Sequence, residues 1–169
     1  MAFPAGTAEP FQVGVSSDDF IPGLSRLAER VHQHGAKIAM QLQHAGKTAV
    51  RDMAEGRQLW VPSVPPVLQS DMMAALTPEE LANFVSSMKR RAEGSPIRVM
   101  DSADIAQMID WFACAADRAR RAGFDGVEIH AAHGYIIAGF LSGYYNQRED
   151  EYGGSLENRM RLRLQGFDA

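Results

Sequence analysis

The sequence predicts an α/β fold built on a parallel sheet. Two short segments, 36–44 and 126–130, alternate apolar and polar side chains in the way that strands do. Around and between them, apolar residues recur at helical spacing. Strands that alternate with amphipathic helices are typical of a parallel sheet joined by right-handed crossovers. We therefore expect both segments to lie in one such sheet.

The first helix is expected after Ser17-Asp18-Asp19, because a capping side chain there precedes Pro22. Its apolar side chains share one face, and Gly35 can end it in a left-handed conformation. The strand over 36–44 follows, with alternate side chains apolar.

Residues 48–76 carry no steady period and contain several prolines, so they are predicted to be a long excursion loop. Thr77-Pro78-Glu79-Glu80 is a capping box with proline at the first helical position. A short helix is expected after it, with an apolar side formed by Leu81, Phe84, Val85 and Met88.

A longer helix is predicted to begin after Asp101-Ser102 and to end at Gly123, with arginines crowding its last turn. In the strand over 126–130, Glu128 and His130 should share one face. A helical turn is expected over 135–141, and a final helix after Ser155.

Length and composition bound the class of protein. The 169 residues, 46% of them hydrophobic, suit one globular domain, whereas a complete (β/α)8 barrel needs roughly 250 residues. The net charge of −4 does not suggest a partner such as nucleic acid or a membrane surface. No signal peptide or membrane-spanning stretch is evident, so a cytoplasmic protein is expected. The single cysteine, Cys114, excludes a disulfide framework and is predicted to be a small buried side chain.

Polar side chains collect where the two predicted strands end, which is where parallel α/β folds place their sites. Gln41, Gln43 and His44 form one set, and His130, His133 and Tyr135 the other. Two imidazoles three residues apart can both donate to an oxyanion or carbonyl, and a phenol can deliver a proton. This combination favours a reaction that builds negative charge on a carbonyl-conjugated substrate.

Plainer interpretations remain open from spacing alone. His130 could be a core histidine whose hydrogen bonds are satisfied, and His133 a loop residue. The interpretation of the two histidines as a metal site has less support, because zinc usually takes three protein ligands and the sequence offers no obvious carboxylate or thiolate nearby. Gln41 could be a structural hydrogen-bonding residue, or its amide could pair with the edge of a heterocycle.

The run from Gly123 to Tyr135, GFDGVEIHAAHGY, strongly resembles the Old Yellow Enzyme family of FMN-dependent NAD(P)H:flavin oxidoreductases. The similarity continues through Phe140-Leu141-Ser142 and through DEYGGSLENR at 150–159. Upstream, QLQHAGK at 41–47 is similar to the family's third-strand motif.

The resemblance implies a fragment of a (β/α)8 barrel, covering about strands 3 and 4 with their helices, with FMN at the carboxyl face. Gln41 would then bind the flavin ring, while His130 and His133 hold the substrate's oxygen and Tyr135 acts as proton donor. NADH or NADPH would be the reductant, and an activated alkene or enone-like molecule the substrate. Residues 1–169 would form one partial FMN-binding domain, with strands 1–2 and 5–8 absent.

The chain also departs from the family pattern. Gly143 stands where proline is usual, and Lys47 where arginine is usual. The alternative to a working flavoenzyme is a truncated, non-catalytic remnant, or one piece of an assembly that does not bind flavin by itself. The physiological substrate, the choice between NADH and NADPH, and a homo-oligomeric state are left open by the sequence.

Overall fold

A computed structural model of the chain describes residues 5–8, 11–64, 77–80, 82 and 96–168. In that part of the chain the strands form two parallel pairs, β1 (Ala39–Leu42) with β4 (Gly126–Ile129) and β2 (Leu59–Val61) with β3 (Ile97–Val99). The helical elements are η1 (Asp18–Phe20), α1 (Ile21–His32), η2 (Gly46–Thr48), α2 (Val50–Ala54), α4 (Ser102–Arg121), α5 (Ile136–Leu141) and α6 (Leu156–Asp168). The predicted parallel pairing of the two main strands is confirmed.

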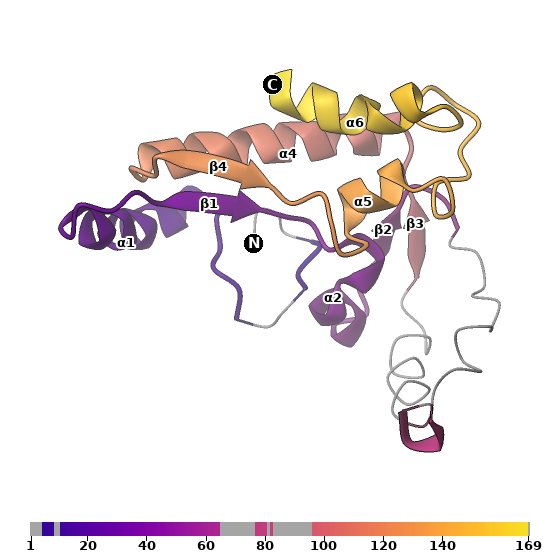
Figure 1. Ribbon diagram of the computed structural model, residues 1–169, viewed down its shortest axis with the longest axis horizontal. Helices are drawn as coiled ribbons and strands as arrows, with labels where there is room; N and C mark the ends of the chain where they lie inside the picture. Colours follow the sequence, from indigo (N-terminus) through magenta and orange to yellow (C-terminus); the bar gives the residue numbers. More distant parts are fainter. Residues whose placement is uncertain (1–4, 9–10, 65–76, 81, 83–95, 169) are drawn as a thin grey trace.

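The central unit is the β1–β4 pair with α4 beside it (Figure 1). Met40 and Leu42 of β1 face the core, where Ile105, Met108 and Phe112 of α4 are buried. Figure 1 shows α6 lying along α4, and α5 lying between the ends of the main strands and the β2–β3 pair. Burying one face of the strands against a helix is how α/β folds remove their apolar surface from water.

Local signals set the ends of α4. Asp101 accepts a hydrogen bond from Asp104 N at 2.8 Å, and the Asp104 side chain accepts one from Asp101 N at 3.2 Å, which is a capping box. At the other end, Arg118 and Arg121 both donate to Asp18 at 2.8 Å, and this lowers the pKa of the Asp18 carboxyl. The helix therefore also fastens η1.

The excursion over 48–76 is not wholly loop. It contains the short helix α2 and the buried strand β2, and residues 65–76 lie outside the described part of the chain. The partner strand β3 was not predicted from the sequence either. Since β2 is buried at all three positions and β3 exposed at all three, neither shows the alternation from which a strand is predicted.

Two further expectations have mixed outcomes. The capping box after the excursion is present, because Glu80 N donates to Thr77 Oγ1 at 3.3 Å and Thr77 N to Glu80 Oε2 at 2.9 Å. Leu81, Phe84, Val85 and Met88, which were to form the apolar side of that helix, lie outside the described residues. The prediction for Cys114 was wrong: it is exposed, because it falls off the stripe of α4 that packs on the strands.

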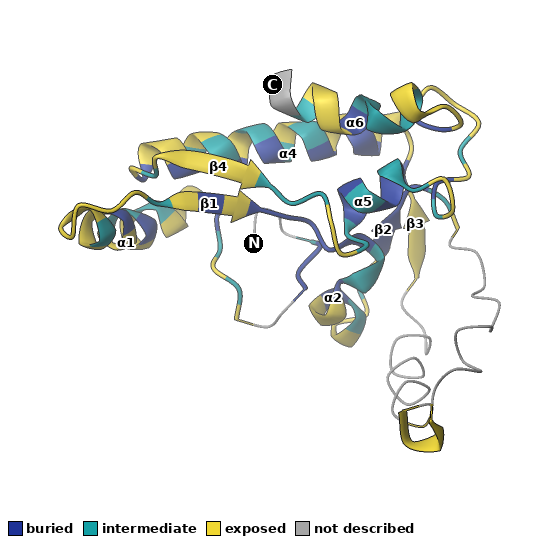
Figure 2. Cartoon of the chain, in the orientation of Figure 1, coloured by how far each residue is buried: buried dark blue, intermediate teal, exposed yellow. Residues whose placement is uncertain are grey.

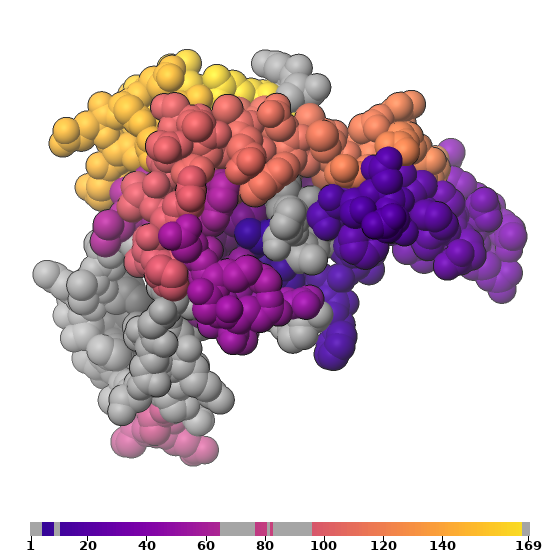
Figure 3. Space-filling model, turned by 180° about the vertical axis from the view of Figure 1, so that it is seen from behind, coloured from indigo at the N-terminus to yellow at the C-terminus, as the bar shows by residue number. Residues whose placement is uncertain are grey.

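Burial is uneven across the molecule (Figure 2). Residues of α5 and β2 are mostly buried, whereas β4 has no buried residue and α1 buries only Leu24 and Ala28. In the space-filling view, α1 and its neighbours form a lobe at one end of the molecule, beside the β4 region (Figure 3). The carboxyl ends of the main strands, where α5 and β2 lie, are thus well buried.

Candidate functional site

The carboxyl ends of β1 and β4 lie at the same edge of the sheet, because the two strands run parallel with Leu42 opposite Ile129. The pairing extends one residue further, since His130 N donates to Leu42 O at 2.9 Å. The two sets of polar residues singled out in the sequence therefore leave the sheet at neighbouring points. This agrees with the expectation that parallel strands gather their chemistry at one edge.

His130, His133 and Tyr135 form a cluster of three rings beyond β4. His130 Nε2 and His133 Nδ1 are 3.0 Å apart, and the imidazoles stack with their centroids separated by 4.9 Å. The Tyr135 ring meets His130 edge-on at 4.9 Å between centroids. His133 is exposed, while His130 and Tyr135 are half-buried, so small molecules can approach the cluster from solvent.

An unusual turn brings the rings together. His133 has φ 53° and Gly134 φ 68°, so two successive residues take the left-handed conformation. For a residue with a side chain this costs roughly 1–2 kcal/mol. Tyr135 N donates to Ala132 O at 3.1 Å, and Ile136 N donates to His44 O at 3.0 Å, which ties the turn to the exit of β1.

Gln41 lies on the neighbouring strand, directly opposite Glu128. Both side chains are exposed and stand on the face of the sheet that α4 does not cover. Glu128 therefore needs no buried partner. The Gln41 amide is open to a ligand on that face, but it is not part of the ring cluster.

Gln43 follows Gln41 by two residues, just past the end of β1, and is 92% buried. Its neighbours set the orientation of its amide. Ala8 N donates to Gln12 Oε1 at 3.1 Å, so that oxygen is an acceptor, and Gln43 Nε2 donates to it at 3.0 Å. The remaining Gln43 Oε1 has no hydrogen-bond partner among the described residues. A buried carbonyl oxygen of this kind is satisfied when an N–H or O–H group approaches it.

His44 completes the β1 exit as a buried structural residue. Its Nδ1 accepts from Gly46 N at 3.1 Å, and burial lowers its pKa to about 4. Gly6 packs directly on the ring, where a Cβ would lie only 2.3 Å from it. The imidazole is therefore neutral at neutral pH and serves as an acceptor.

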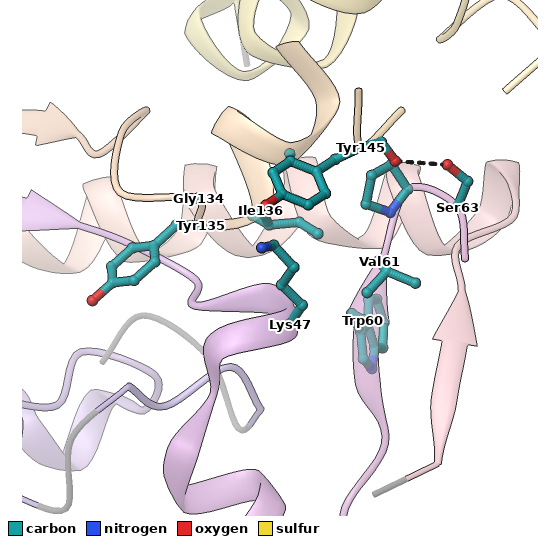
Figure 4. Close-up of a pocket in the computed structure, with 10 residues that line it drawn as sticks. Lys47, Trp60, Val61, Ser63, Gly134, Tyr135, Ile136 and Tyr145 are labelled. Carbon is teal, nitrogen blue, oxygen red and sulfur yellow. Dashed lines mark hydrogen bonds between the residues drawn. The ribbon is translucent and has the colours of Figure 1, made fainter. Parts of the chain in front are cut away.

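A small pocket adjoins the ring cluster, between η2, the end of β2 and α5 (Figure 4). Lys47 lies within it, with Nζ 3.8 Å from the centroid of the Tyr145 ring. Tyr135 lines one side of the pocket, but Figure 4 shows its ring directed away from Lys47. Sequence reasoning did not find this contact, because Lys47 and Tyr145 lie far apart in the chain and β2 was not foreseen.

A family model described as the NADH:flavin oxidoreductase / NADH oxidase family matches residues 2–169. The chain belongs to this family. Among the chain's relatives, an NADPH dehydrogenase from Halalkalibacterium halodurans is 42% identical over 159 residues, which are 94% of the chain and 39% of the relative. An NADH oxidase from Thermoanaerobacter brockii is 37% identical over 96% of the chain and 22% of its own length. The chain thus spans about two fifths or less of these relatives.

Solved structures of the family have the same fold. Old Yellow Enzyme from a Pichia species is 30% identical and superposes with a TM-score of 0.71, over 97% of this chain and 40% of its own. Morphinone reductase in complex with tetrahydroNAD is 31% identical and superposes with a TM-score of 0.77, over 99% of this chain and 44% of its own. The expected fold, a part of the family's (β/α)8 barrel, is confirmed. No helix in the described ranges is long and apolar enough to cross a membrane.

The residues at the sheet edge fit one part of FMN, the edge of its ring. That edge presents imide N–H and carbonyl groups, and the site offers the exposed amide of Gln41 and the unpartnered acceptor oxygen of Gln43. Both come from β1 or its exit, at the sheet edge from which the imidazole pair also extends.

Proposed function

We propose that this chain carries the substrate-facing part of an FMN-dependent oxidoreductase that passes hydride from NADH or NADPH to an activated alkene. The observation that carries the proposal is the imidazole pair. His130 Nε2 and His133 Nδ1 share a hydrogen bond at 3.0 Å, so in the free chain one of these nitrogens is the donor and the other the acceptor. A substrate oxygen that replaces this bond can lie within hydrogen-bond distance of both nitrogens, with each ring in the tautomer that donates to it. Two N–H donors on one oxygen stabilise the negative charge that grows there when a conjugated carbonyl accepts hydride at its β-carbon.

Each residue of the cluster then has a task. His130 and His133 hold the carbonyl or nitro oxygen, which orients the alkene. Tyr135, whose ring meets His130 edge-on, gives its phenolic proton to the α-carbon. Gln41 holds the edge of the flavin ring from the neighbouring strand. Bound FMN would supply the hydride. The substrate is a small molecule of enone type, and a homo-oligomer is compatible with this function.

The first test is whether the purified full chain retains or takes up FMN, measured by flavin absorbance and by equilibrium dialysis with free FMN. Binding supports the proposal, and Gln41→Ala should weaken it. A chain that stays colourless and cannot be reconstituted contradicts the proposal for this chain. That result would favour the alternative of a non-catalytic remnant or one piece of an assembly.

Substituting Tyr135 tests the proton step separately. In flavin-loaded protein, we expect Tyr135→Phe to slow reduction of an enone on the order of 100-fold, which is the usual size of a general-acid contribution. Reduction of the flavin by NADPH should keep its rate, because that half-reaction needs no proton from the phenol. Stopped-flow absorbance measures both half-reactions.

The exposed tyrosine next to the pocket provides the matched control. Tyr144→Phe removes a phenol that is outside the ring cluster, so both half-reactions should proceed as in the wild type. If Tyr135→Phe also reduces enones at the wild-type rate, Tyr135 is not the proton donor.

A further inference from the structure

The turn at His133 and Gly134 has a backbone conformation that must be stabilised by the rest of the chain. His133 is the only residue other than glycine with positive φ in the described part of the chain, and it is followed by Gly134, which is also left-handed. Such conformations persist where the surrounding structure holds them. Because His133 is exposed, its own side chain is not packed in the core. Backbone hydrogen bonds from Tyr135 N and Ile136 N hold one side of the turn, and further support can come from side chains that face it.

Lys47 faces that turn from the other strand exit, and both line the small pocket. A Cβ built on Gly134 would lie 3.7 Å from Lys47 Nζ and 3.9 Å from Cε, so the end of the lysine stands over this glycine about one methyl group away. The same ammonium lies 3.8 Å from the centroid of the Tyr145 ring, in the geometry of a cation–π contact. Figure 4 shows the lysine end between the Gly134–Ile136 segment and Tyr145.

Tyr145 is itself fixed by the end of β2. Ser63 Oγ donates to Tyr145 O at 2.8 Å and accepts from Gln147 N at 2.8 Å. The backbone on both sides of Asn146 is therefore tied to the excursion segment, and the dashed line in Figure 4 marks the first of these bonds. These bonds fix the backbone that carries the ring, which limits where the ring and the ammonium on its face can lie.

We propose that Lys47 is a positioning residue, which holds the His133–Gly134 turn through its contact with the Tyr145 ring and so keeps the two imidazoles stacked. The role of this stacking in catalysis rests on the proposed function. The geometric effect does not, because it exists in the flavin-free chain. In this proposal Lys47 acts through the turn.

The test uses the full chain without flavin and with labelled histidine. The imidazoles of His130 and His133 stack at 4.9 Å between centroids, which is close enough for a nuclear Overhauser cross peak between their ring protons. Lys47→Met keeps the length of the side chain and removes its charge, so we expect that cross peak to be lost. Lys47→Arg should restore it, because a guanidinium also binds the face of a tyrosine ring.

Tyr145 gives an independent pair of variants. Tyr145→Phe keeps the ring and should keep the cross peak, whereas Tyr145→Leu removes the ring and should lose it. This pair decides the question if Lys47→Met does not fold. Lys37→Met is the charge control, because Lys37 is exposed and pairs with Asp125 near the start of the strands; it should leave the cross peak intact.

Thermal melting separates positioning from general destabilisation. Loss of the cross peak in Lys47→Met or Tyr145→Leu, at a melting temperature near that of the wild type, supports the proposal. A cross peak that persists in both variants overturns it, as does one that Lys47→Arg fails to restore. Neither result bears on flavin binding, so this proposal and the proposed function can fail separately.

Discussion

At the scale of single residues, the candidate site combines exposed imidazoles with a buried one. His130 and His133 can reach a ligand, whereas His44 is enclosed and neutral. The two roles follow from position on adjoining strand exits. The chain continues past His44 into η2, whose first residue, Gly46, is buried, but it turns outward at His133. Of these three histidines, only the two at the turn have the access that chemistry requires.

The burial of His44 predicts an acid-sensitive fold. Burial lowers its pKa from 6.5 to about 4, so between these pH values the unfolded chain binds this proton more readily than the folded one. Stability should therefore fall as pH drops from about 6.5 to about 4, by about 3 kcal/mol in total from this one group. Urea unfolding at pH 7 and pH 4.5 measures the loss.

His44→Asn is the control for this prediction. Its amide oxygen can replace Nδ1 as acceptor for Gly46 N, and it does not titrate. The variant should lose clearly less stability than the wild type over the same pH interval, because it lacks the titrating imidazole. The carboxyl groups of the chain contribute equally in both proteins. Equal losses in the two proteins would show that His44 is not the group responsible.

At the scale of elements, α4 organises the described structure. Its N-terminal Asp104 also binds Arg98 of β3, with Nη2 to Oδ1 at 2.6 Å, and hydrogen bonding to this guanidinium lowers the pKa of the carboxyl.

Asp125 connects the starts of the main strands, because it accepts from Ile38 N at 2.9 Å and from Lys37 Nζ at 2.8 Å. Its pKa is strongly lowered, chiefly by the bond to Lys37.

The capping box of α4 can be tested by substitution. Asp101→Ala removes the acceptor for Asp104 N and should cost about 1 kcal/mol in the free energy of unfolding. Asp101→Asn retains an oxygen in that place and should stay close to the wild type. Urea denaturation at neutral pH compares the three proteins, and an alanine variant as stable as the wild type would show that the cap contributes nothing.

At the scale of the whole molecule, an apolar groove of about 510 Å³ lies open beside the main sheet. It is lined by residues of α4, the two main strands and the end of α6, among them Phe112, Phe124, Val127 and Ile129. Val127 is 41% exposed although valine favours burial. Large exposed apolar surfaces of this kind bind apolar ligands or other apolar surfaces.

This groove predicts that the folded chain binds an apolar dye such as anilinonaphthalene sulfonate at neutral pH. Val127→Thr keeps the shape of the side chain and should lower the dye fluorescence by making the groove more polar. Leu164→Thr is the control, because Leu164 on α6 is exposed to a similar degree, 50%, but does not line the groove. Equal fluorescence from both variants would place the dye elsewhere.

The sequence by itself determined the order of the main elements and the residues of the ring cluster. Caps and periodicity are local, so α1, α4 and the two main strands could be predicted from their own residues. Other features depend on residues that meet only in the folded chain. The β2–β3 pair has no period of its own, the exposure of Cys114 depends on which stripe of α4 packs, and the Lys47–Tyr145 contact joins two distant loops. Such contacts depend on how the elements pack against one another, which no local pattern encodes.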